Sequence, residues 1–195
     1  MMGSGLESTN RRMAIGGALA GAVALAVPNR QSRIVTQRGM VGGGLVEFDQ
    51  GQASFSLFVS RMIFPGDDAE VVVGSVIWVD DADQLTLRST AITEYNVPQV
   101  QPAQGVLRQI IGTMDAGAEG EYPFELEVTD VDLPGSGQDT VVLKVGDGAR
   151  TSENATPASD LGFSYMASGM VATGDIQELD LEIDLETGDV RPAED

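Results

Sequence analysis

Apolar and polar side chains alternate along most of the chain with a period of two residues. In the segment 53–60, Ala53, Phe55 and Leu57 alternate with serines. Such alternation is typical of a β-strand with one buried and one solvent-facing side. Helical spacing is hard to find from residue 42 onward. The pattern therefore predicts an all-β domain.

Turn-forming clusters divide this pattern into roughly nine strands. Pro65-Gly66-Asp67-Asp68 and Asp80-Asp81-Ala82-Asp83 are two of these clusters, and Pro, Gly and Asp all favour turns. The expected strands cover residues 45–48, 53–60, 71–79, 85–95, 105–114, 120–128, 140–145, 163–170 and 179–185. Short strands at this spacing favour an antiparallel β-sandwich or a flattened barrel.

The last expected strand has the most regular alternation. Leu179, Leu181, Ile183 and Leu185 alternate with aspartate and glutamate. This predicts a half-buried strand whose carboxylate face is solvated and discourages edge pairing. The alternative is a strand that is offered to a neighbouring subunit.

The N-terminal segment has the pattern of an export signal. Arg11-Arg12 precede an uncharged apolar run at residues 13–27, which is shorter than a membrane-spanning helix needs to be. The run ends in Ala24-Leu25-Ala26, a small-x-small pattern of the kind that signal peptidases cleave. The paired arginines resemble a twin-arginine signal, although Ala14 stands where that pattern usually has a large apolar residue. A general secretory signal and an uncleaved N-terminal anchor are the alternatives.

These features divide the chain into four segments. We expect a twin-arginine-like signal helix at residues 1–27 and a flexible lead-in at 28–41. A single all-β domain follows at residues 42–187, and residues 188–195 form a loose acidic tail. The mature chain is expected to contain no membrane span.

Composition narrows the possible functions. The 195 residues include 30 acids and 11 bases, which gives a formal net charge of −19, and they include neither cysteine nor histidine. The missing residue types exclude disulfides, zinc–thiolate sites, histidine-bound metals and both Ser-His-Asp and Cys-His catalysis. The negative charge disfavours binding to nucleic acids and to anionic membranes. Cleavage after Ala26 would leave 29 acids and 9 bases.

The order of strands and turns resembles a β domain of bacterial secreted and cell-surface proteins, which often follows so-called choice-of-anchor modules. Four stretches carry the resemblance: Gly44 to Asp49 with Gly51-Gln52-Ala53-Ser54-Phe55; Gly74 to Asp80 with Ser89-Thr90-Ala91-Ile92-Thr93; Gly120-Glu121-Tyr122-Pro123-Phe124 with residues 130–139; and Tyr165 to Gly169 with Gly174-Asp175-Ile176-Gln177. The resemblance implies a compact antiparallel domain with an accessory role outside the cell, and it brings no catalytic residues. This chain adds the acidic strand 179–185 and shows no anchor module.

Four aspartates are the candidate metal ligands. Asp130, Asp132 and Asp139 surround the turn Pro134-Gly135-Ser136-Gly137, and Asp147 lies one strand away. Calcium prefers six to eight oxygen ligands, and a glycine-rich turn can supply carbonyls. The spacing is not that of an EF-hand, and aspartate also occupies turns because its side chain bonds the local backbone.

We therefore expect a non-catalytic exported β domain that is a structural or interaction module at the cell envelope or outside the cell. Its envelope or extracellular partner is not specified by the sequence. Two alternatives stay open: a calcium-assisted carbohydrate-binding module, and a hydrolase that uses paired carboxylates such as Asp130 and Asp139. Trp78, the only tryptophan, lies among Val and Ile and is expected in the core rather than on a sugar-binding surface.

Overall fold

The computed structural model describes residues 34–49, 51–65, 70–131, 138–152, 154–157 and 160–193. The expected signal helix at residues 1–27 lies outside the described residues. No helix in the described part of the chain is long and apolar enough to cross a membrane.

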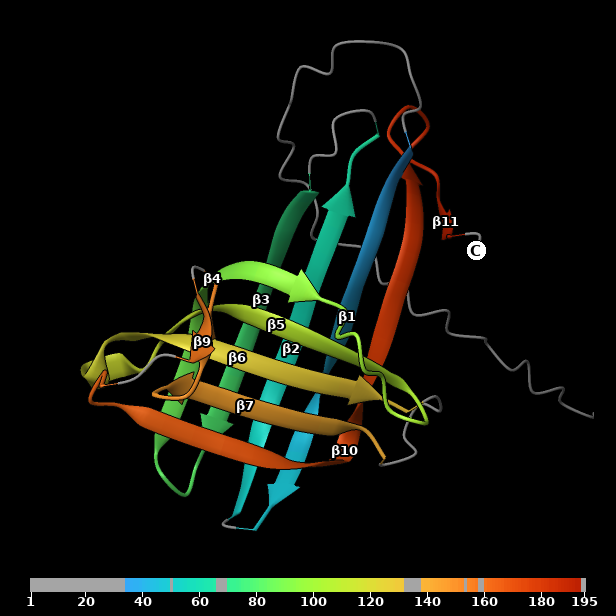
Figure 1. Cartoon of the computed structure of the whole chain (residues 1–195). Helices are drawn as coiled ribbons and strands as arrows, with labels where there is room; N and C mark the ends of the chain where they lie inside the picture. Colours follow the sequence, from blue (N-terminus) through green and yellow to red (C-terminus); the bar gives the residue numbers. More distant parts are fainter. Residues whose placement is uncertain are drawn as a thin grey trace, which may run out of the picture. The chain divides into compact units, whose positions relative to one another are not determined.

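Eight antiparallel strands close into a barrel, which confirms the predicted all-β fold (Figure 1). The strands are β1 (Ile34–Phe48), β2 (Gly51–Ile63), β3 (Glu70–Asp80), β4 (Leu85–Asn96), β5 (Val106–Asp115), β6 (Glu121–Asp130), β7 (Thr140–Gly146) and β10 (Ser164–Asp184). Each strand pairs with the next one in this order, and β10 pairs with both β7 and β1. The double pairing of β10 closes the barrel.

Smaller elements complete the fold. A short 3₁₀ helix, η1 (Gly117–Glu119), connects β5 to β6. The hairpin of β8 (Arg150–Thr151) and β9 (Asn154–Pro157) forms a separate two-stranded sheet, and β11 (Val190–Pro192) adds a ninth strand to the main sheet beside β10.

Two expected segment boundaries differ from the structure. Residues 34–41 were expected in the flexible lead-in, but they form the first half of β1 and pair with β2 on one side and β10 on the other. Residues 190–192 were expected in the loose tail, but they pair with Leu181, Glu182 and Ile183 of β10. At residues 34–41 the ordered conformation comes from ladders to β2 and β10, and at residues 190–192 it comes from a short hairpin with the end of β10.

Four of the eight barrel strands extend beyond the ends of the other four. The first halves of β1 and β3, the end of β2 and the second half of β10 run on past β4 to β7 (Figure 1). The pairing shows the same feature, because β4 pairs with β3 only at residues 77–80. We call this extension the projecting strands: residues 34–41, 58–63, 70–75 and 177–184.

Apolar side chains fill the interior of the barrel, as the alternation predicted. In β2, Ala53, Phe55, Leu57 and Val59 are buried while the serines at 54 and 56 are exposed. Trp78 is fully buried in the same core cluster, which confirms its predicted place. A barrel of eight strands has an interior that side chains can fill.

Candidate functional site

Of the four aspartates proposed as calcium ligands, the structure places Asp130 and Asp139 at one end of β7, where Thr129 pairs with Thr140, and Asp147 at the other end. Asp139 directly precedes β7 and Asp147 directly follows it, so they lie roughly 25 Å apart along the strand. Asp130 ends the neighbouring strand β6, and Asp132 lies outside the described residues. No three acidic side chains in the described part of the chain are grouped so that they could hold a metal ion. The geometry therefore does not support one site built from all four.

Asp139 instead holds the strands together. The residue is only 4% exposed. Its Oδ1 accepts a hydrogen bond from the Val131 N–H and its Oδ2 accepts one from the Ile176 N–H, both at 3.0 Å. Its backbone carbonyl accepts a third from the Val171 N–H at 2.9 Å. These bonds offset the cost of burying a carboxylate and tie the β6–β7 connection to β10.

Charged side chains gather where the barrel interior meets the projecting strands. Alternate residues of a strand point to the same face, so a core neighbour two positions away fixes the direction of a side chain. Arg61 follows Val59 on β2 by two positions, and Arg108 precedes Ile110 on β5 by two. Val59 and Ile110 are both in the buried core. The two arginines therefore point inward.

The same argument places an acidic side chain opposite them. Glu178 follows the buried Ile176 on β10 and pairs with the core residue Met40. Asp180 comes two positions later and pairs with Arg38. We call the inward-facing group at this end of the barrel the barrel mouth; its members are Arg38, Arg61, Tyr95, Arg108, Glu178 and Asp180.

Two ion pairs lie in the barrel mouth, and one of them crosses it. Arg108 Nη2 donates to Glu178 Oε1, and the Arg108 side chain is only 13% exposed. Arg38 Nε donates to Asp180 Oδ1 at 3.3 Å, between side chains that are about half exposed. The Arg108–Glu178 pair joins β5 to β10 across the interior, whereas the Arg38–Asp180 pair joins neighbouring strands and is weakened by solvent.

Arg61 lies directly opposite Arg38 in the β1–β2 ladder. Like charges at directly opposed positions of an antiparallel pair are destabilising. Arg61 Nη1 donates to Glu70 Oε2 at a long 3.5 Å, while its Nε is buried and has no hydrogen-bond partner among the described residues. The charge of Arg61 is therefore only partly balanced.

Tyr95 of β4 reaches the same space from the other side of the interior. It is 2% exposed, and its hydroxyl has no hydrogen-bond partner within the described part of the chain. Burial raises the pKa of Tyr95 to about 12, with Arg108 and Arg61 lowering it and Glu178 raising it further. The Arg108 guanidinium approaches the hydroxyl oxygen and can only donate to it, so the Tyr95 O–H itself has no acceptor among the described residues. The side chains of Arg61, Arg108 and Glu178 therefore lie close enough to act on the Tyr95 hydroxyl.

A second polar group at the other end of the barrel is fully bonded. Trp78 Nε1 donates to the Tyr165 hydroxyl at 2.8 Å, and that hydroxyl donates to Asp80 Oδ2 at 2.9 Å. Asp80 Oδ1 accepts from the backbone N–H groups of Ala82 and Asp83. Burial raises the pKa of Tyr165. Because every member is satisfied, this chain of bonds stabilises the β3–β4 turn.

A third polar group lies on the outer face, beneath the β8–β9 hairpin. Glu125 of β6 is 1% exposed. Its carboxylate accepts from Gln109 Nε2 at 2.9 Å and from the Arg150 N–H at 3.2 Å. Lys144 Nζ and Arg150 Nε each lie 3.7 Å from its oxygens. Glu125 therefore anchors the hairpin to the barrel wall.

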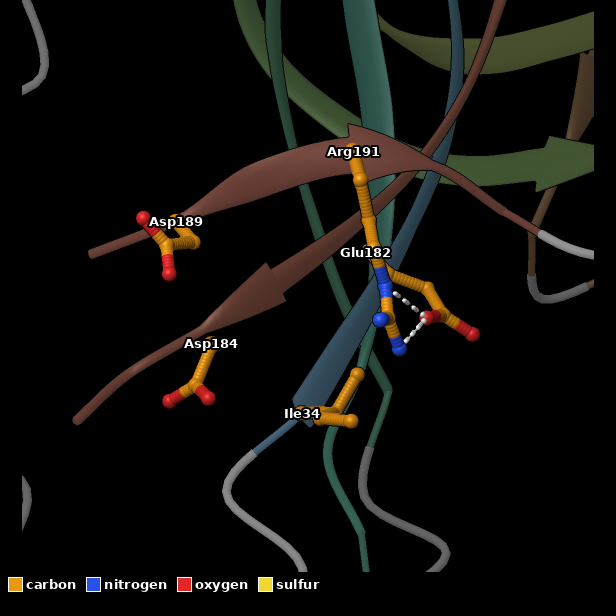
Figure 2. A pocket seen from close by; sticks show the side chains of 5 residues that line it. All are labelled: Ile34, Glu182, Asp184, Asp189 and Arg191. Carbon is orange, nitrogen blue, oxygen red and sulfur yellow. Dashed lines mark hydrogen bonds and ion pairs between the residues drawn. The ribbon is translucent and has the colours of Figure 1, made fainter. Parts of the chain in front are cut away.

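A pocket of about 170 Å³ lies where β10 turns into β11, lined by Ile34, Glu182, Asp184, Asp189 and Arg191 (Figure 2). Arg191 holds Glu182 with two hydrogen bonds, at 2.9 Å from Nε and 2.7 Å from Nη2. Asp184 Oδ1 accepts from the backbone N–H groups of Glu186 and Thr187. These contacts stabilise the β10–β11 turn.

The barrel mouth was not among the sites expected from the sequence. A signal existed, because Arg61 continues the alternation of Ala53, Phe55, Leu57 and Val59 onto the same face. A charged residue on a core-facing position is informative, since buried charges need partners. The acids of the last strand were expected on a solvated outer face. The structure instead places Glu178 and Asp180 on the face that continues the barrel interior.

Comparisons with known proteins add no relative. A scan against protein-family models, a search of curated proteins and a search of solved structures each returned no match.

Proposed function

We propose that the chain is an exported, non-catalytic β-barrel module that serves in structure or interaction at the cell envelope or outside the cell. The Arg11-Arg12 pair, the short apolar run and the Ala24-Leu25-Ala26 pattern support export. The resemblance to domains of bacterial secreted and surface proteins supports the same location.

The barrel mouth is the observation that carries the interaction role. Apolar side chains fill the barrel, and the projecting strands then continue its inner face as a polar surface. Three of the eleven basic residues, Arg38, Arg61 and Arg108, belong to this one surface. In a chain with 30 acids, these three arginines gather at one end of the barrel, where each contacts one acid: Asp180, Glu70 or Glu178.

The hydrogen bonds that the Asp130 and Asp139 carboxylates accept from the backbone support a non-catalytic role. Hydrolysis by paired carboxylates needs two groups that are free to face the substrate. Both side-chain oxygens of Asp139 accept hydrogen bonds from backbone N–H groups, and Asp130 Oδ2 accepts one from the Glu178 N–H at 3.0 Å. The two candidates named from the sequence therefore serve the fold.

Export can be tested by producing the full chain with a C-terminal tag in a bacterium that has both export pathways. We expect the tagged protein in the envelope or medium, with an N-terminus at Val27. A variant with Arg11→Lys and Arg12→Lys should remain in the cytoplasm if the twin-arginine route is used, and unchanged export of this variant would indicate the general pathway. An uncleaved chain that stays in the cytoplasm in every case would overturn the proposal.

A further inference from the structure

Two buried hydrogen-bond donors in the barrel mouth lack acceptors. The Tyr95 hydroxyl and Arg61 Nε are the buried side-chain atoms without a partner among the described residues. Buried polar groups in folded proteins are nearly always hydrogen-bonded, because an unmet donor is costly. Both exceptions lie in the same site, on strands that do not neighbour each other.

The surrounding charges add to this need for an acceptor. Arg38 and Arg61 are directly opposed across the β1–β2 ladder, which places two positive charges side by side. Arg108 lies beside the Tyr95 hydroxyl on the far side of the interior. Glu178 pairs with Arg108 and Asp180 pairs with Arg38, so within the described residues the Arg61 guanidinium has only the long contact to Glu70.

We propose that the barrel mouth binds the oxyanion group of a small ligand, with the Tyr95 hydroxyl and the Arg61 guanidinium as the donors. A carboxylate or phosphate group offers two or more acceptor oxygens on one centre. Guanidinium N–H groups match that geometry, and charge-assisted hydrogen bonds of this kind are the strong ones. This inference names the ligand class of the interaction site and so rests on the proposed function.

The acids of the barrel mouth restrict the rest of the ligand. Glu178 and Asp180 repel a second anionic group, and their oxygens accept hydrogen bonds from hydroxyl groups. A ligand with one oxyanion and several hydroxyls satisfies both requirements. The site therefore fits an acidic sugar unit, either a uronate or a sugar phosphate.

Calorimetric titration of the purified full chain tests this inference. Sodium glucuronate and glucose 6-phosphate are titrated at constant ionic strength, with glucose as the neutral reference. We expect saturable binding of at least one acidic sugar and none of glucose. The two acidic sugars separate a carboxylate source of the oxyanion from a phosphate source.

Matched variants locate the binding. Tyr95→Phe removes the hydroxyl but keeps the ring, and Arg61→Gln removes the guanidinium; each should weaken binding about tenfold. Two controls make the same chemical changes elsewhere. Tyr122→Phe removes a hydroxyl that donates to the Glu119 carbonyl, and Arg88→Gln removes an exposed charge from the outer face of β4. Both controls should bind like the parent chain.

Three outcomes contradict the inference: no saturable binding of either acidic sugar, equal binding of glucose, or an equal loss in the control variants. Tyr95→Phe should melt no lower than the parent chain, since it removes a buried donor that has no acceptor in the described structure. The export experiment is independent of these results. A chain that is exported but binds no acidic sugar refutes this inference alone, whereas a chain that binds one but is retained in the cytoplasm refutes only the proposed location.

Discussion

At the residue scale, the buried carboxylates have a structural role, because they accept hydrogen bonds from backbone N–H groups. Asp80 and Asp139 are nearly inaccessible, yet each accepts two backbone hydrogen bonds through its side chain. Aspartate was expected in turns because it bonds nearby backbone. Asp80 does so, with partners two and three residues away, whereas the partners of Asp139 lie 8 and 37 residues away. Sequence spacing could not reveal the second arrangement.

Asp139→Asn should therefore lower the free energy of unfolding by about 1–3 kcal/mol. An amide has one acceptor oxygen, so its NH₂ group would face one of the two N–H donors from Val131 and Ile176. Asp147→Asn is the matched control, because Asp147 is half-buried and the Leu161 N–H can keep an amide oxygen as its acceptor. Urea unfolding of both variants measures the difference, and equal losses would contradict the assigned role.

The buried Tyr95 should make the protein less stable in alkali. Its pKa is raised to about 12 in the folded state, against about 10 in an unfolded chain. Between these pH values the unfolded chain releases a proton that the folded chain retains, so stability is present below pH 10 and is lost as the pH rises to about 12. Urea unfolding from pH 8 upward should show this decline, and Tyr95→Phe should make it shallower. An identical decline in the variant would show that other groups cause it.

At the element scale, alternation predicted a strand well where its two partners in the sheet are the preceding and the following strands of the chain. The strands from β2 to β7 match the expected segments because each alternates regularly between two turns. The 21-residue β10 was expected as two separate strands, at residues 163–170 and 179–185. Its pairing with β1 skips Ala172, and this bulge moves the inward-facing positions from odd to even residue numbers. Alternation therefore continues on both sides of the bulge, and only the numbering of the inward-facing positions changes.

Glycine allows the same strand to bend. Gly174 has a φ of +102°, and a Cβ atom there would collide with the Gly43 carbonyl. It pairs with Gly44, so the two backbones approach without side chains between them. The strand changes partner before this point, because its pairing with β7 ends at Met170, where its pairing with β1 begins.

The β8–β9 hairpin should depend on Glu125. Glu125→Ala removes the acceptor of the Gln109 Nε2 and Arg150 N–H hydrogen bonds, and leaving such buried donors without a partner costs about 1–3 kcal/mol. We expect faster tryptic cleavage after Arg150 together with the loss of stability. Glu121→Ala removes an exposed carboxylate from the same strand and should change neither. Unchanged cleavage in Glu125→Ala would show that the hairpin is held by other contacts.

At the scale of the whole domain, closure of the barrel depends on contacts that local patterns do not contain. The sequence left open a sandwich or a flattened barrel, because both need similar strands at similar spacing. The pairing of β1 with β10, between residues 123 to 150 positions apart in the chain, decides between them. The barrel mouth arises from this pairing, since it places Glu178 and Asp180 on the inner surface that Arg38, Arg61 and Arg108 share.

The acidic charge of the chain should make its stability depend on ionic strength rather than on calcium. With a formal charge of −19, the folded state is destabilised by self-repulsion, which salt screens. We expect the melting temperature to rise with sodium chloride. Calcium chloride and magnesium chloride should then act alike at equal ionic strength, because Asp139 and Asp147 lie at opposite ends of β7 and cannot share an ion. A saturable rise with millimolar calcium that magnesium does not reproduce would restore the calcium hypothesis and direct the search to carboxylates outside the described residues.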